Sequence, residues 1–354
     1  MRVGLLLNQK FDELTLAVGR ALTRSGVQVK SYSFPFLEAL QSDRPDTTLA
    51  FNGPLADTSG HFLSDLISIP HVACLTHSAP WFVDFKDSSR IKIGCSDPSD
   101  VHFFLNLKNK NAFFLPPACD KNLRPSGHPK VYDVSLVASC IDIRAIEEGW
   151  RRDYSEKMVQ VLHHAADVAL MTEGCPYWQA FSEVLSAHRP KDALDFPSLM
   201  LALESLELYL LGKSRIDLLT HISDRVIDVF GLGWEPYVKS LPHVRLHLPS
   251  DQEAIEKSRV LLSPRDPFAT LSAFALGTLP VTSENEYLSQ HYQDKKSILF
   301  YHPGSWRALQ DKLSNALENA EHYSALVAAG LAITLESQTW DNRVPIFFKE
   351  MSSR

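Results

Sequence analysis

The chain has 354 residues, enough for about two domains, and its 45% hydrophobic and 22% charged residues are typical of globular proteins. Its 35 Lys and Arg residues against 42 Asp and Glu residues give a net charge of −7, which argues against a protein that holds nucleic acid through its phosphates. The sequence has no apolar run of about eighteen residues, so we expect no transmembrane segment, and the apolar run 3–7 is too short for a signal peptide.

The first third of the chain alternates short apolar runs with amphipathic spans. Residues 2–7 form an apolar run typical of a buried strand, and from Asp12 onward apolar residues recur at helical spacing until Gly26 ends the pattern. Further runs typical of strands are 27–32, 48–51, 71–75 and 112–115. Strands separated by helical spans indicate crossover connections and a parallel sheet. Residues 1–125 are therefore predicted to form one α/β domain.

A second series of the same kind follows a linker at 122–130 that contains proline and glycine. Its predicted strands are 131–137, 226–230, 244–248, 260–263 and 278–282, and helical patterns cover 308–320 and 325–331. Between the first two of these strands, residues 145–222 are mostly helical, with breaks near Pro176 and Pro190. We expect a second α/β domain at 126–335, with a helical insert at about 145–222, and a C-terminal segment at 336–354.

The clearest signal for ligand binding lies in residues 263–282. Asp266 is a suitable N-cap, Pro267 suits the first helical position, and Gly277 suits the turn that ends a helix. The predicted helix begins where a strand of a parallel sheet ends, which is where α/β proteins bind ligands. Its N-terminal N–H groups, with Arg265 beside them, would favour a phosphate. The alternative is an ordinary capped helix without a ligand.

Three further candidates lie at the ends of predicted strands. Gly231 and Gly233 would let a ligand approach the backbone closely, or would only form a turn. His77 follows the strand 71–75, where an imidazole could take a proton from a hydroxyl group, and a structural histidine is the alternative. Tyr301 would contact a ligand or belong to the core.

Motifs in both halves of the chain resemble those of one enzyme family. Residues 271–281 are similar to the pattern F-E-A-x-A-x-G-x-x-P/L-V, and the later matches are Phe300-Tyr301, Thr339 and Arg343. Residues 133–139 resemble D-V-S-F-V-G-S, residues 231–234 resemble G-x-G-W, and residues 115–120 resemble L-P-x-G-x-D. The chain thus resembles the CgeB-like, family-1-type glycosyltransferases, best over 226–343 and in patches over 71–140.

This resemblance implies the GT-B fold, in which two Rossmann-like domains face each other across a cleft. Residues 1–125 would be the acceptor domain, 126–335 the domain that binds a nucleotide-sugar donor, and 336–354 a helix that crosses back to the first domain. The implied activity is transfer of a sugar from a nucleotide-diphosphate donor to a hydroxyl group of a glycan or protein. The implied catalytic base is His77, and the implied donor-binding residues are Gly231, Gly233, Trp234, Arg265, Phe268, Ser272, Glu284, Glu286 and Tyr301.

The sequence lacks several motifs of other enzymes. It has no D-x-D pair of the kind that holds a divalent cation in metal-dependent glycosyltransferases. It also has no P-loop, no G-x-G-x-x-G after the first strand and no G-x-S-x-G. We therefore expect no metal and no cofactor besides the donor itself. The five scattered cysteines form no C-x-x-C pair, which indicates reduced thiols and a cytoplasmic protein.

One departure from the family pattern leaves alternatives open. Ser272 stands where the pattern has a glutamate, whose carboxylate accepts hydrogen bonds from both ribose hydroxyls of the donor. Either Glu284 or Glu286 replaces it, or the donor is bound differently. The alternatives are a non-catalytic GT-B protein that binds a glycan or a partner, and a sugar-nucleotide epimerase. The helical insert would serve for packing, with a homo-oligomer contact as a second possibility.

Overall fold

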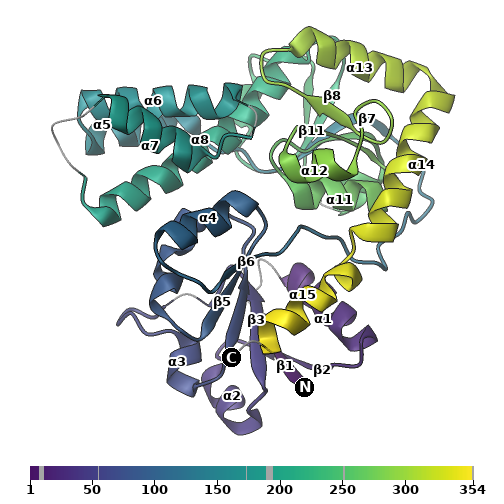
Figure 1. Ribbon diagram of the computed structural model, residues 1–354. Coiled ribbons are helices and arrows are strands. Elements are labelled where there is room, and N and C mark those ends of the chain that lie inside the picture. Colours follow the sequence, from purple (N-terminus) through teal and green to yellow (C-terminus); the bar gives the residue numbers. More distant parts are fainter. Residues whose placement is uncertain (8–11, 55, 173, 189–193, 250–251, 353–354) are drawn as a thin grey trace. The chain divides into compact units, whose positions relative to one another are not determined.

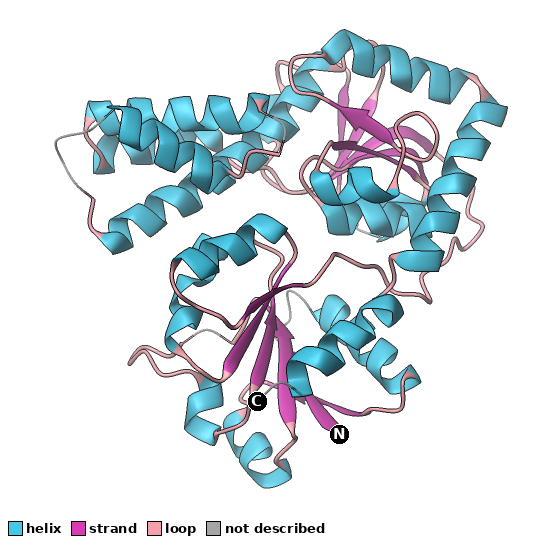
Figure 2. Cartoon of the chain, viewed as in Figure 1, coloured by secondary structure: helices cyan, strands magenta, loops and turns pink. Residues whose placement is uncertain are grey.

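The computed structural model describes residues 1–7, 12–54, 56–172, 174–188, 194–249 and 252–352. The chain divides into two compact units (Figure 1). Unit 1 comprises Met1–Asn122 and Ser337–Arg354, and unit 2 comprises Leu123–Glu336. Within the described residues each unit has one parallel sheet of six strands, flanked by helices (Figure 2). The α/β class expected from the sequence is thus confirmed.

Unit 1 has the strand order β2-β1-β3-β4-β5-β6. Its central strand β3 is buried along its whole length, and α1 packs on the sheet through a small apolar face that includes Val18 and Leu22. The strands are β1 (Arg2–Leu7), β2 (Gln28–Ser33), β3 (Thr47–Phe51), β4 (His71–Cys74), β5 (Ile91–Cys95) and β6 (Ala112–Phe114). The helices are α1 (Asp12–Arg24), α2 (Leu37–Asp43), α3 (Leu63–Ile67), η1 (Ala79–Asp87), α4 (Pro98–Asn106) and α15 (Trp340–Ser352).

The C-terminal segment completes unit 1, although more than two hundred residues separate it from the rest of that unit. Cys119 and the segment 338–340 exchange two backbone hydrogen bonds of 3.0 Å, and α15 packs against α1. Trp340 is buried and contacts the ring of Phe51 edge-on, with 5.5 Å between ring centroids. The buried Arg343 donates to the carbonyl oxygens of Pro116 and Pro117 at 3.2 and 3.1 Å.

Unit 2 has the strand order β12-β11-β10-β7-β8-β9, with all neighbouring strands parallel. This is the Rossmann order, in which the chain reverses direction across the sheet between β7 and β10. The strands are β7 (Tyr132–Val137), β8 (Ile227–Phe230), β9 (Val244–His247), β10 (Ser258–Leu262), β11 (Leu279–Ser283) and β12 (Leu299–Tyr301). The helices around them are α9 (Glu235–Val238), α10 (Gln252–Glu256), α11 (Pro267–Ala275), α12 (Glu286–His291), α13 (Trp306–Glu318) and α14 (Ala320–Ser337).

Among the described residues, four helices lie between β7 and β8 in the chain. They are α5 (Ile143–Asp153), α6 (Glu156–Met171), α7 (Tyr177–His188) and α8 (Phe196–His221). They pack mainly on one another and extend away from the sheet (Figure 1). Only the last turns of α8 enter the core of the sheet, through Leu218 and Leu219. The helical pattern read from the sequence therefore corresponds to a small bundle with its own core.

No helix in the described part of the chain is long and apolar enough to cross a membrane.

Candidate functional site

The strand order of unit 2 places the candidate site at one point of the sheet edge. In a Rossmann order, ligands bind beyond the carboxyl ends of the two strands at which the order reverses, here β7 and β10. The segments that follow these strands are residues 138–142 and 263–266. The second of them contains Arg265 and Asp266, which the sequence had singled out.

The start of α11 agrees with the sequence prediction. The Asp266 carboxylate accepts a hydrogen bond of 2.9 Å from the backbone N–H of Ala269, and Pro267 is the first helical residue. The Ser263 hydroxyl is linked to that of Thr270 at 2.9 Å, which ties the end of β10 to the first turn of the helix. The N-terminus of α11 is therefore fixed at the carboxyl edge of the sheet, where its positive dipole end is half-buried and capped by Asp266.

Arg265 has an unusual backbone conformation for its position. Its φ of 56° lies in the left-handed region, which costs a non-glycine residue free energy and is enriched at functional sites. Its guanidinium donates to the carbonyl oxygen of Ala169 on α6 at 2.8 Å. Its charge also reaches Tyr301: burial raises the pKa of that hydroxyl, and the Arg265 charge opposes the rise. Arg265 therefore lies beyond the carboxyl end of β10, within electrostatic reach of Tyr301.

A second arginine at this edge, Arg215, was missed by sequence reasoning. Arg215 lies on α8 and donates to the carbonyl oxygen of Ser139, just beyond β7, at 2.9 Å. Burial lowers its pKa, and the nearby Asp266 carboxylate opposes that effect. Gly212 explains the close approach of α8, because a Cβ there would lie 2.7 Å from the Ile143 side chain. In the sequence Arg215 is only one of several charged residues of this helical segment, with Lys213 two positions before it, and nothing local marks it as a ligand contact.

Gly231 and Gly233 have structural roles, as the turn alternative expects, and their contact with a donor stays a prediction. A Cβ at Gly231 would lie 2.2 Å from the carbonyl oxygen of Ala138, so this glycine lets the segments after β7 and β8 touch. Gly233 has a φ of 82°, which favours glycine. Trp234 is buried, and its indole N–H donates to the same Ala138 oxygen at 2.7 Å. The prediction that Trp234 contacts a donor is therefore corrected: its ring packs in the core.

Tyr301 also requires a correction. Only 3% of its surface is exposed, and its ring lies in the core of unit 2, stacked near Trp306 with 6.1 Å between ring centroids. The sequence suggested a donor contact because Tyr301 ends a strand, but the side chains along a strand alternate between its two faces, and this one faces the core.

The two predicted glutamates differ in their surroundings. Glu284 follows β11, and one of its carboxylate oxygens lies 3.6 Å from Nε2 of His302, which follows β12. Both side chains are partly exposed, so this pair stands at the carboxyl edge of the sheet. Glu286 is the exposed first residue of α12. Ser272 and Phe268 are half-buried residues of α11, and Ser272 lies in the second turn, away from the helix start.

His77 lies in unit 1, in the segment between β4 and η1. Neighbouring bonds fix this segment: the Asn52 side chain bonds both the backbone N–H and the hydroxyl of Thr76, and the Asp100 carboxylate accepts from the N–H of Ala79 at 2.9 Å. The His77 ring is half-buried beside Trp81, with 5.8 Å between ring centroids. His77 thus stands beyond the carboxyl end of β4, where an α/β unit presents side chains to a ligand.

The structure therefore brings together Arg215, Arg265 and the start of α11, with the Glu284–His302 pair further along the same edge of the sheet in unit 2. It places His77 in the other unit. In the described part of the chain, no cluster of three or more His, Cys, Asp or Glu side chains is arranged to hold a metal ion.

Residues 215–348 match a family model described as glycosyl transferase-like. The match covers less than half of the chain and begins at Arg215, so it includes Arg265 and the whole of α11. No curated protein matches this sequence. The family match supports a glycosyltransferase as the class of enzyme.

Solved structures with a similar fold are glycosyltransferases of the GT-B type. An α-glucosyltransferase in complex with UDP and a 13-mer DNA containing an HMU base has a TM-score of 0.58 at 11% identity, with both chains fully covered. Anabaena HepE in complex with UDP and glucose has a TM-score of 0.56 at 11% identity, again with full coverage of both chains. A variant of S. aureus TarM in complex with UDP has a TM-score of 0.52 at 10% identity, and 90% of this chain spans 58% of TarM. At these identities the likeness shows the fold.

Proposed function

We propose that this protein is a metal-independent glycosyltransferase that moves a sugar from a nucleotide-diphosphate donor to a hydroxyl group. The observation that carries the proposal is the meeting of two arginines, Arg215 and Arg265, with the N-terminus of α11 at the point where the strand order of unit 2 reverses. The family match and the GT-B fold support the same class of reaction. The CgeB-like subtype is part of the proposal.

The chemistry of this edge suits a departing diphosphate. Negative charge builds on the diphosphate as the bond to the sugar breaks, and a metal-independent enzyme must stabilise that charge with its own groups. Arg215 uses one of its five N–H donors on Ser139 among the described residues, so its other donors remain for phosphate oxygens. At the start of α11 the Asp266 carboxylate already takes the N–H of Ala269, so the contribution of this helix would be the positive end of its dipole.

Glu284 is the best candidate for the ribose of the donor. Ser272 cannot accept hydrogen bonds from two hydroxyl groups as a carboxylate does, and Glu286 is the more exposed of the two remaining candidates. The only side-chain partner of the Glu284 carboxylate in the described part of the chain is Nε2 of His302, at 3.6 Å, which leaves the carboxylate able to accept two O–H groups. His302 would then orient the carboxylate.

We further propose that unit 1 binds the acceptor and that His77 activates its hydroxyl group if the reaction inverts the anomeric configuration. A glycan or a protein fits a chain with a net charge of −7 better than a nucleic acid does. We place the activity in the cytoplasm, in keeping with cysteines that form no disulfide in the described structure.

Binding of nucleotides tests this proposal directly. The melting temperature is measured with UDP, GDP, TDP and CMP compounds, each with magnesium and with EDTA. We expect one nucleoside diphosphate to stabilise the protein, by about 2.7 kcal/mol at a hundred times its Kd, equally in both buffers. A loss of stabilisation on chelation would contradict metal independence, and a panel without any stabilising nucleotide would contradict the activity.

A second candidate function rests on Ser272. Without the family glutamate, the protein could bind a donor or a glycan and not transfer sugar. Release of the nucleoside diphosphate from a bound nucleotide sugar distinguishes the two functions: a transferase hydrolyses its donor slowly even without acceptor, whereas a binding protein leaves it intact.

A further inference from the structure

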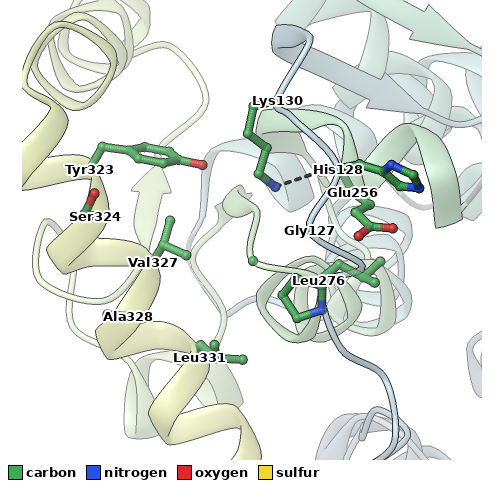
Figure 3. A pocket seen from close by; sticks show the side chains of 12 residues that line it. Gly127, His128, Lys130, Glu256, Leu276, Tyr323, Ser324, Val327, Ala328 and Leu331 are labelled. Carbon is green, nitrogen blue, oxygen red and sulfur yellow. Dashed lines mark hydrogen bonds between the residues drawn. The ribbon is translucent and has the colours of Figure 1, made fainter.

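A cavity of about 360 Å³ lies at the opposite edge of the unit 2 sheet from the site described above. Its polar residues stand before the amino ends of strands: Lys130 precedes β7, and Glu256 precedes β10. All of its lining belongs to unit 2. Figure 3 shows residues of α14 on one side, His128 and Glu256 on the other, and Lys130 reaching between them. Its volume is at the lower end of small-molecule pockets, roughly 300–1,000 Å³.

The Lys130 ammonium has neutral partners in this cavity. Nζ donates to the backbone oxygen of Glu256 at 2.8 Å and to the hydroxyl of Thr278 at 2.9 Å. An ammonium has three N–H donors, and no third partner for it exists in the described part of the chain. Nor does any described carboxylate oxygen lie within ion-pairing distance of Nζ, because the Glu256 carboxylate is engaged by the backbone N–H of Ser126. Burial lowers the pKa of Lys130 to about 8, in agreement with an ammonium that lacks a close counter-ion.

The remaining walls of the cavity are largely apolar. α14 contributes Val327, Ala328 and Leu331, and Leu276 faces them from the other side (Figure 3). Pro125 also lines the cavity. The hydroxyl of Tyr323 already donates to the backbone oxygen of Arg259 at 2.9 Å. A ligand here would therefore meet the Lys130 ammonium, with Glu256 and His128 beside it, at one end and mainly hydrocarbon along α14.

We propose that this cavity binds a small monocarboxylate with an apolar body, whose carboxylate takes the third N–H of Lys130 and whose body packs against α14. A single negative charge is favoured over a phosphate dianion because only one ammonium is present and the Glu256 carboxylate is nearby. The proposal does not depend on the glycosyltransferase activity, because the donor site lies at the other edge of the sheet.

Benzoate serves as the probe, with benzamide as its uncharged analogue and inorganic phosphate as the competing anion. Calorimetry or ligand-observed NMR on the full chain should show saturable binding of benzoate in the millimolar range. We expect benzamide and phosphate to bind at least about tenfold more weakly, since each lacks either the charge or the apolar body.

Two variants and one control test whether the probe binds in this cavity. Lys130→Met keeps the length of the side chain and should weaken benzoate at least about tenfold. Ala328→Trp fills the apolar end and should block binding while Lys130 is intact, which covers the case of a Lys130 variant that does not fold. Lys257→Met, the matched control, removes a charge that pairs with Glu253 outside the cavity and should change nothing. Unaltered binding in the folded Lys130 and Ala328 variants, equal binding of benzamide, tighter binding of phosphate or no saturable binding would each overturn the proposal.

Discussion

Arg265 can be tested by the part of the ligand that it contacts. If its guanidinium meets the diphosphate, Arg265→Ala should weaken UDP by about ten- to a hundredfold, because a hydrogen bond to a charged group contributes about 1.5–3 kcal/mol. Uridine, which has no phosphate, should bind as before. Isothermal titration with both ligands measures the difference, and Arg215→Ala should behave in the same way.

Arg245→Ala is the control for both arginines, since Arg245 is exposed on β9 and its loss makes the same change in net charge. Equal losses for UDP and uridine in the Arg265 variant would show that this side chain never reaches the phosphates.

His77 can be tested by separating turnover from donor binding. If His77 is the base, His77→Ala should lower kcat by about 10²–10⁴-fold and leave donor affinity unchanged, because the proposed donor site belongs to unit 2. The exposed His61, also in unit 1, provides the control variant His61→Ala. A lower melting temperature with full specific activity in the folded fraction would make His77 a structural histidine.

His71 predicts a pH dependence of stability. It is fully buried on β4, where Nε2 donates to the Gly53 oxygen at 2.6 Å, so Nδ1 must accept from the Thr48 hydroxyl at 2.9 Å. Burial lowers its pKa to about 4 from 6.5, so as the pH falls the unfolded chain takes up the proton first. The contribution of His71 to the free energy of unfolding should therefore be complete above pH 6.5. It should fall by roughly 3 kcal/mol as the pH is lowered toward 4.

Urea unfolding at pH 7.0 and 4.5 measures this decline. His71→Gln removes the titrating group, so its stability should change less with pH than that of the native chain. An identical change in both proteins would exclude His71 as the cause.

At the scale of single elements, the sequence predicted those helices and strands whose limits depend on neighbouring residues in the chain. The strand near residues 2–7, the break near Pro176 between α6 and α7, and the start of α11 at Pro267 agree with the described elements. The predicted break near Pro190 lies outside the described residues. β5 was missed, because its five residues include the polar Lys92 and a glycine. Its place is decided by pairing with β4 and β6, and that pairing leaves no periodic signal.

In the candidate site, too, the residues marked by local features were predicted and those positioned by distant parts of the chain were not. Asp266 and Arg265 could be found from the sequence because capping and strand-end positions are local properties. Arg215 could not, because it reaches Ser139 across 76 residues of chain. Trp234 was assigned to the donor because residues 231–234 resemble the G-x-G-W of the family. The sequence cannot tell whether a ligand or a carbonyl group approaches these glycines.

Gly231 gives a prediction for the contact between two strand ends. Gly231→Ala would place a methyl group 2.2 Å from the backbone oxygen of Ala138, which cannot move as a side-chain tip can. We expect a loss of about 1–3 kcal/mol or more in the free energy of unfolding, measured with denaturant. Gly149→Ala in α5 is the matched control, because its nearest neighbour is the tip of Arg152 at 3.9 Å. It should be neutral or stabilising by up to about 1 kcal/mol, and a similar loss in both variants would contradict the role given to Gly231.

At the scale of the whole molecule, the two units have separate cores. Trp340→Ala removes the buried ring that packs on Phe51 and should cost about 3–5 kcal/mol. Hydrogen exchange should show the loss of protection in residues 1–122 and 337–354 and not in the sheet of unit 2. Equal loss of protection in both sheets would mean that the units unfold together.

The interrupted course of unit 1 also affects how the protein is made. Domains usually fold in the order of their synthesis, the N-terminal one first. Here the first 122 residues leave the ribosome without the segment 337–354 that covers Phe51 and binds the carbonyl groups of Pro116 and Pro117. Unit 2 is continuous in the chain and can fold before the last segment of unit 1 has been synthesised. The nascent N-terminal part therefore exposes an apolar surface until residues 337–354 have been synthesised. A chaperone would bind the chain most readily during this interval.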